Sequence, residues 1–270
     1  MELVDGRLTR FTLAGCRLVA IHHLHRLAGP HRSRSINRQL GAILAFVAGA
    51  TNAGGFLAVQ RYTSHMTGII SAIADDMATG GSGLALAGLA SLLAFVAGAA
   101  CTALIVNWAR RRNLHGAYAL ALMVEAALLL LFGVLGANLA SLAHLVVPAT
   151  VLLLCFIMGL QNAIITKISQ AEIRTTHMTG VVTDLGIEMG RLLYWNRSHD
   201  ANAVHFVRAN RDKLFIHATV LGLFFLGGVI GANGFKRFGF AATIPLACLL
   251  VLVASPALLV DLRHGLPRRR

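Results

Sequence analysis

Charged residues are scarce in this sequence: they make up 13% of its 270 residues, whereas hydrophobic residues make up 56%. A water-soluble domain of this length needs far more charge to cover its surface, so a soluble globular fold is excluded. Acidic residues are scarcest, with 11 Asp and Glu against 24 Lys and Arg, which gives a formal net charge of +13.

Cysteines are also few, and Cys16, Cys101, Cys155 and Cys248 are far apart, without a Cys-x-x-Cys pair or a Cys/His cluster. Such spacing indicates neither a disulfide framework nor a metal site, and we expect no cofactor. The sequence also lacks a His-Glu-x-x-His motif and a recognisable nucleophile–base pair. We therefore predict that the protein is not an enzyme and has no catalytic residues.

The excess of basic residues does not indicate a nucleic-acid partner, because no zinc-finger spacing, aromatic-laced basic stretch or helix-turn-helix pattern accompanies it. The Lys and Arg residues instead stand between and beyond apolar blocks, as in cytoplasmic loops of membrane proteins. The expected partner is the lipid bilayer.

Long apolar blocks are the feature that the sequence has in abundance. A block of about 20 residues with few charges is long enough to cross the hydrocarbon layer as a helix, and lipid leaves helices as the fitting structure for such blocks. We predict an all-α integral membrane protein with six transmembrane helices, at residues 40–59, 84–108, 117–137, 142–165, 214–233 and 240–260.

The two ends of the chain differ from its middle. Residues 1–38 form a basic extension in which apolar residues alternate with Arg and His, and residues 263–270 form a basic tail. The extension suits a helix lying on the membrane surface, with a solvated segment as the alternative. We expect both ends in the cytoplasm of a bacterial cell, and the membrane domain at 39–262 in its inner membrane.

The membrane domain contains an internal repeat. His-Met-Thr-Gly occurs at residues 65–68 and again at 177–180, and Asn52-Ala53 recurs as Asn162-Ala163. We divide the domain into repeat one, 39–138, and repeat two, 142–262. Each repeat reads as an apolar block, a polar loop, a short helix and two more apolar blocks.

The short helices that start at Met66 and Met178 decide the topology. If both return to the side on which they begin, 21 of the 24 Lys and Arg lie on the side of the N-terminus; if both cross, 16 do. The positive-inside rule favours the first arrangement. It gives two inverted repeats with two re-entrant or half helices, and a seven- or eight-span protein is the alternative.

The starts of the two short helices are the candidate substrate site. We expect N-caps at Thr63 or Ser64 and at Thr175 or Thr176, and the unpaired N–H groups of a helix start suit an anion or a polar solute. The duplicated motif would equally serve close helix packing, as Gly227-x-x-x-Gly231 does in a later block. The residues assigned to the site are Asn52, His65, Thr67, Gly68, Asn162, His177, Thr179 and Gly180.

Five acidic residues stand within the apolar region and are costly to expose to lipid. Glu125 lies at the centre of the third block, with His144, Asn138 or Arg174 as candidate partners. The other four, Asp75, Asp76, Asp184 and Glu188, come late in the short helices. There they face either water or a basic partner.

At these motifs the chain resembles the YoaK family, bacterial multi-pass membrane proteins defined as a domain of unknown function. The second repeat matches closely, with Gly-Leu-Gln-Asn-Ala at 159–163, Thr-His-Met-Thr-Gly at 176–180 and Asp-Leu-Gly at 184–186. The first departs at Asn52, where the family has Asp, and at Ile69, where it has Asn. The resemblance spans residues 38–262 and implies a cell-membrane protein without a known activity.

Inverted repeats with short helices at matching positions are typical of transporters and channels whose site lies near the middle of the membrane. We therefore predict a transporter or channel for a small solute, with an anion favoured, that works by alternating access. The alternative is a non-transporting scaffold or accessory subunit in which the motif serves helix packing. A homo-oligomer is compatible with both.

Overall fold

The computed structural model describes residues 34–114, 116–139, 143–168, 177–195 and 207–263, and these contain helices and no strand. Most of the expected N-terminal extension and nearly all of the basic tail lie outside the described residues. The helices are α2 (Arg34–Val59), α3 (Met66–Ala78), α4 (Ser82–Arg111), α5 (Ala117–Ala137), α6 (Ala143–Ile168), α7 (Met178–Leu193), α8 (Arg211–Phe238), the 3₁₀ helix η1 (Gly239–Ala242) and α9 (Thr243–Arg263).

Five helical stretches of the described chain are long and apolar enough to cross a membrane, which makes this a multi-pass membrane protein. The fifth stretch, Arg211–Arg263, contains both α8 and α9. Gly239 separates them with a φ of +59°, a left-handed conformation that glycine adopts without steric cost. Each of the six predicted blocks thus coincides with one helix or, for the last block, with η1 and α9 together.

One end of the bundle gathers the starts of α2, α5 and α8 and the ends of α4, α6 and α9, and we call it the basic end. Lys and Arg are concentrated there, including the run Arg110 to Arg112 at the end of α4. Hydrogen bonds tie these helix ends together: Asn37 Nδ2 donates to the Ile168 carbonyl (3.1 Å), Tyr118 OH to the Lys167 carbonyl (3.4 Å), and the Gly116 N–H to Asp261 Oδ2 (2.8 Å).

The relative directions of the long helices follow from which residues meet. In α2 and α8, Arg38 lies 4.0 Å from Asp212 and Gly54 lies against Phe235, so these helices run parallel. In α2 and α6, Asn37 bonds to Ile168 while Gly55 lies against Leu154, so these run antiparallel.

The same comparison places α4 parallel to α6, because Gly98 lies against Phe156 and the Thr102 hydroxyl donates to the Leu160 carbonyl at 2.9 Å. Consequently α2 and α4 run in opposite directions, with α3 between them along the chain. The helices α6 and α8, which flank α7, are also opposed.

Four of the Phe-x-x-Gly sequences, at 46–49, 95–98, 156–159 and 224–227, make the closest helix crossings. Where α2 crosses α8, a Cβ on Gly49 would lie 2.0 Å from the Phe224 carbonyl oxygen, and one on Gly227 would lie 2.1 Å from that of Phe46. Any larger residue would push the backbones apart, so these positions require glycine.

The crossing of α4 and α6 repeats this geometry. A Cβ on Gly98 would lie 2.0 Å from the Phe156 oxygen, and one on Gly159 would lie 2.0 Å from the Phe95 oxygen. Each crossing therefore joins one helix from residues 39–138 to one from 142–262, and the two crossings use the same pair of contacts.

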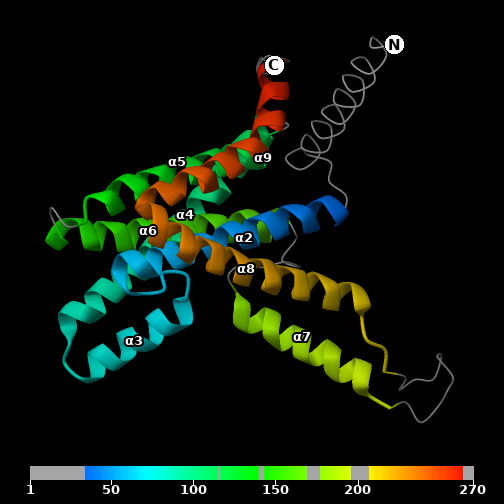
Figure 1. Ribbon diagram of the computed structural model, residues 1–270, viewed down its shortest axis with the longest axis horizontal. Helices are drawn as coiled ribbons and strands as arrows, with labels where there is room; N and C mark the ends of the chain where they lie inside the picture. Colours follow the sequence, from blue (N-terminus) through cyan, green and yellow to red (C-terminus); the bar gives the residue numbers. More distant parts are fainter. Residues whose placement is uncertain (1–33, 115, 140–142, 169–176, 196–206, 264–270) are drawn as a thin grey trace, which may run out of the picture.

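The short helices α3 and α7 lie alongside the long ones, toward the left and the right of the lower part of Figure 1. Helix α3 packs on α4, with Ile73 against Gly88, and α7 packs on α8, where Asp184 lies 3.8 Å from His217. With 13 and 16 residues they are about 20 and 24 Å long, less than the roughly 30 Å of hydrocarbon. Neither is long enough to cross on its own.

Candidate functional site

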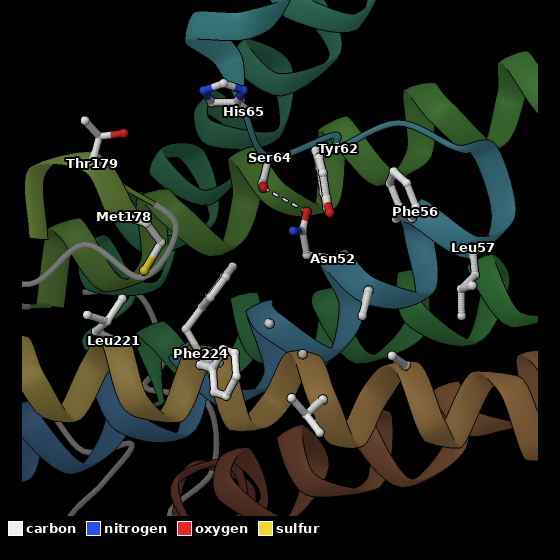
Figure 2. Close-up of a pocket in the computed structure, with 16 residues that line it drawn as sticks. Asn52, Phe56, Leu57, Tyr62, Ser64, His65, Met178, Thr179, Leu221 and Phe224 are labelled. Atoms are coloured by element: carbon white, nitrogen blue, oxygen red, sulfur yellow. Dashed lines mark hydrogen bonds between the residues drawn. The ribbon is translucent and has the colours of Figure 1, made fainter. Parts of the chain in front are cut away.

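A cavity of about 660 Å³ lies beside the C-terminal half of α2 and the middle of α8, where both short helices begin. Its walls come from α2, the loop after α2, the first turn of α7 and α8 (Figure 2). The lining residues are Gly49, Asn52, Ala53, Phe56, Leu57, Tyr62, Ser64, His65, Met178, Thr179, Leu221, Phe224, Phe225, Gly228, Val229 and Ala232.

The loop between α2 and α3 folds back over α2 and shapes one wall. Gln60 turns the chain with a φ of +54°, and the Tyr62 ring then stacks on Phe56 with 4.7 Å between centroids. The Ser64 hydroxyl donates to Asn52 Oδ1 at 2.9 Å, the dashed line in Figure 2. This bond fixes the orientation of the Asn52 amide at the edge of the cavity.

Histidines, and not hydroxyl residues, occupy the N-cap positions of the short helices. His65 precedes α3 and His177 precedes α7, and neither side chain caps a backbone N–H. The prediction of an N-cap at Thr63 or Ser64 is therefore wrong. The Ser64 hydroxyl donates its hydrogen bond to Asn52, and Thr63 is buried. Thr175 and Thr176 lie outside the described residues.

The two histidines lie in matching places over the first helical turn. A Cβ on Gly68 would come 2.6 Å from His65 Nδ1, and one on Gly180 would come 3.0 Å from His177 Nδ1. The glycine of Met-Thr-Gly therefore leaves room for the imidazole against its own helix, which is a local explanation for the duplicated motif.

Of the eight predicted site residues, the structure brings Asn52, His65 and Thr179 to the cavity. Thr67 is exposed on the first turn of α3, His177 is exposed, and Asn162 is half-buried on α6; none of these three lines the cavity. Gly68 leaves room for His65, which lines the cavity, whereas Gly180 leaves room for His177, which does not.

The five acidic residues have different surroundings. Glu125 is 1% exposed in the centre of α5, and neither carboxylate oxygen has a hydrogen-bond partner among the described residues. The suggestion of Asn138 as its partner is wrong, since that amide donates to the Val134 carbonyl at the far end of α5. The side chain of His144, and Arg174, lie outside the part that the structure describes.

Glu188 is the acid with the most partners. The residue is 4% exposed. Its carboxylate accepts a hydrogen bond from the Arg191 guanidinium at 2.8 Å and another from the backbone N–H of Asn210 at 2.7 Å. It thereby ties the end of α7 to the start of α8. Asp75 is exposed, and Asp76 is half-buried on α3.

The aromatic and apolar wall of the cavity was not foreseen. Phe56, Tyr62 and Phe224 are part of this wall. Nothing in an apolar block distinguishes a cavity-lining Phe from one that faces lipid. The repeated Phe-x-x-Gly was the available signal for Phe224, because it marks where α8 meets α2. In the described residues no group of three or more His, Cys, Asp or Glu could hold a metal ion.

Comparison with known families adds one match. The family model described as Protein of unknown function (DUF1275) matches residues 40–255, which include most of both repeats and every residue that lines the cavity. The chain belongs to this family. The predicted YoaK-like resemblance is thereby confirmed, since that family is a DUF1275 family of membrane proteins. No curated protein and no solved structure matches this DUF1275 chain.

Proposed function

We propose that this DUF1275 protein is a transporter or channel for a small solute in the bacterial inner membrane, and that the 660 Å³ cavity is its solute site. The observation that carries the proposal is the placement of this cavity: it lies beside the C-terminal half of α2 and the middle of α8, at the point where one short helix from each repeat begins. Transporter sites are commonly built from such interrupted helices near the middle of the membrane.

Two features support an arrangement of six crossings in two inverted repeats. A half helix returns the chain to the side on which the half helix begins, so the long helices before and after it must run in opposite directions. This holds for α2 and α4 around α3, and for α6 and α8 around α7. The two Phe-x-x-Gly crossings, α2 with α8 and α4 with α6, are what an internal two-fold relation between the repeats produces.

The proposed orientation has the basic end in the cytoplasm. Of the 14 Lys and Arg in the described chain, 11 belong to segments at this end, and Arg61, Lys236 and Arg237 are the other three. The positive-inside rule associates such a bias with the cytoplasmic face.

The lining suits a small organic anion with an apolar part. Phe56, Phe224 and Val229 offer apolar surface, while Asn52 and Thr179 offer hydrogen bonds. The first N–H groups of α3 and α7, which have no side-chain cap, favour negative charge on the solute.

The directions of the short helices support alternating access as the mechanism. Helix α7 extends from the cavity to the basic end, where Glu188 meets Asn210, and α3 extends to the opposite end, where it leads into α4. Movement of α7 would open the cavity to the cytoplasm, and movement of α3 would open it to the other side.

The test begins with a thermal-shift screen of the purified protein against organic acids, inorganic anions and neutral metabolites. A solute at 100 times its dissociation constant stabilises the folded state by about 2.7 kcal/mol, which is readily measured. Uptake of the identified solute into proteoliposomes then follows. Asn52→Leu and Thr179→Val should abolish uptake without loss of folded protein.

Thr67→Val is the matched control, because Thr67 occupies the same motif position as Thr179 but does not line the cavity. It should keep wild-type uptake. If no solute class stabilises the protein, or if the three variants are indistinguishable, the transport proposal is wrong and a scaffold role gains support.

A further inference from the structure

A second hollow lies on the outer surface between α4 and α5, far along α4 from the place where α3 packs. This groove has a volume of about 590 Å³ and is lined by Leu104, Ile105, Trp108, Leu120, Met123, Val124 and Ala127. All the lining side chains are apolar except for the indole N–H. Leu104 is 71% exposed, so the groove is open to the surroundings of the bundle.

The groove leads to three consecutive arginines at the end of α4. Arg110 is already engaged, because its guanidinium donates to the Tyr118 hydroxyl and lies 5.5 Å from that ring. Arg112 lies 5.6 Å from the centroid of the Trp108 ring, which is itself part of the groove. A cation held against this ring stands at the mouth of the groove.

Arg111 and Arg112 are both exposed, and neither forms an ion pair with an acidic residue among the described parts of the chain. A guanidinium presents paired donors that fit a phosphate group, which makes Arg suitable for a phosphate diester. The site thus combines an open apolar groove with two positive charges, which no acidic residue of the described chain pairs with, at the end of α4.

We infer that this groove is a binding site for an anionic glycerophospholipid, with one acyl chain between α4 and α5 and the phosphate at Arg111 and Arg112. From Leu120 to Ala127 the groove extends about 10 Å along α5, enough to hold the upper part of an acyl chain. Charge complementarity selects the anionic headgroup over a zwitterionic one. Basic pockets between transmembrane helices bind anionic lipid headgroups in this way.

Native mass spectrometry of the full-length protein, titrated with phosphatidylglycerol or phosphatidylcholine in mild detergent, tests this inference. The wild type should retain phosphatidylglycerol in preference to phosphatidylcholine. Arg111→Gln with Arg112→Gln should weaken phosphatidylglycerol binding by roughly thirtyfold, the effect of two basic side chains at about 1 kcal/mol each. Free glycerol phosphate should not compete, since it has no chain to occupy the groove.

Two further variants separate the groove from general attraction to charge. Ala127→Phe fills the groove without changing charge and should also weaken retention, whereas Ala97→Phe, on an exposed part of α4 outside the groove, should not. Lys236→Gln with Arg237→Gln removes the same charge at the opposite end of the bundle and should leave retention unchanged.

The inference is overturned if phosphatidylcholine is retained equally, if Ala127→Phe has no effect, or if the Lys236/Arg237 pair matters as much as the Arg111/Arg112 pair. Competition by glycerol phosphate would instead assign the arginines to a soluble phosphate. None of these outcomes depends on whether the protein transports a solute.

Discussion

At Gly49 the backbone of α8 lies where a side chain would otherwise be, since the Phe224 carbonyl oxygen stands 2.0 Å from the position of a Cβ. Small residues allow this approach in membrane proteins, where helix association depends on van der Waals contact and close backbone interactions. The obstructing atoms belong to a helix backbone, so a rotamer change cannot relieve the clash.

Gly49→Ala is therefore expected to lower the free energy of unfolding by about 1–3 kcal/mol, the range for an overpacked contact. Gly222→Ala is the control, because Gly222 is in α8 but a Cβ at this position would have nothing within 4 Å, and alanine favours helix by up to about 1 kcal/mol. Thermal or denaturant unfolding in detergent measures both. Equal stability of the two variants would contradict the crossing.

Glu125 is a second residue whose environment allows a prediction. Removing an acceptor that has no partner among the described residues should not destabilise the fold, and an apolar replacement of similar shape can be neutral or stabilising. We expect Glu125→Gln and Glu125→Leu to unfold at or above the wild-type temperature.

Gln161→Leu provides the comparison, because Gln161 is equally buried but donates to the Leu44 carbonyl at 3.1 Å. Its loss should cost about 0.6 kcal/mol, a typical value for hydrogen bonds between transmembrane helices. A loss above about 2 kcal/mol in Glu125→Gln would show that the carboxylate has a partner, outside the described residues, that matters for folding.

At the scale of elements, α7 depends on few contacts for its position. Glu188 bonds to Arg191 within the helix and to the Asn210 N–H, and Asp184 lies near His217. Asp76 on α3 is the counterpart of Glu188 in the repeat. Among the described residues, its carboxylate forms no such hydrogen bond to the long helix that follows.

Glu188→Ala is expected to release the end of α7 from α8. A hydrogen bond to a charged group contributes about 1.5–3 kcal/mol, so amide hydrogen exchange in α7 should accelerate roughly ten- to hundredfold. Asp76→Ala should leave exchange in α3 and α7 within a few fold of wild type. Unchanged α7 protection in Glu188→Ala would show that other contacts hold this helix.

The elements were largely predictable and their caps were not. A run of 20 apolar residues has few alternatives to a membrane helix, so the blocks at 117–137 and 40–59 correspond closely to α5 and α2. The N-caps failed because Ser64 had two possible partners, the α3 backbone and Asn52, and the choice depends on how the loop folds over α2.

The partners of each helix were also out of reach. An apolar block shows that a segment crosses the membrane, but it does not show which face of the helix contacts another helix and which faces lipid. The sequence therefore did not indicate that α2 pairs with α8. Phe-x-x-Gly recurs at unequal spacings, which hides it from a search for a fixed period.

For the whole molecule, the proposed topology places Arg61 and Ser82 on the side opposite to Arg112 and Asn210. In a variant without native cysteines, single cysteines at Arg61 and Ser82 should react with an impermeant maleimide added to intact spheroplasts. Cysteines at Arg112 and Asn210 should react only after the membrane is opened. Labelling of Arg61 and Ser82 from different sides would mean that α3 crosses the membrane.

Because α2 pairs with α8, the nascent chain meets a delay during synthesis. Gly49 and Gly228 are 179 positions apart, and at about 5–20 residues per second the ribosome needs roughly 10–35 seconds between them. Throughout that interval α2 has left the ribosome and α8 has not yet been made. Insertion must therefore either shelter α2 beside the translocon or supply a temporary neighbour, which makes the early intermediate a natural client for membrane chaperones.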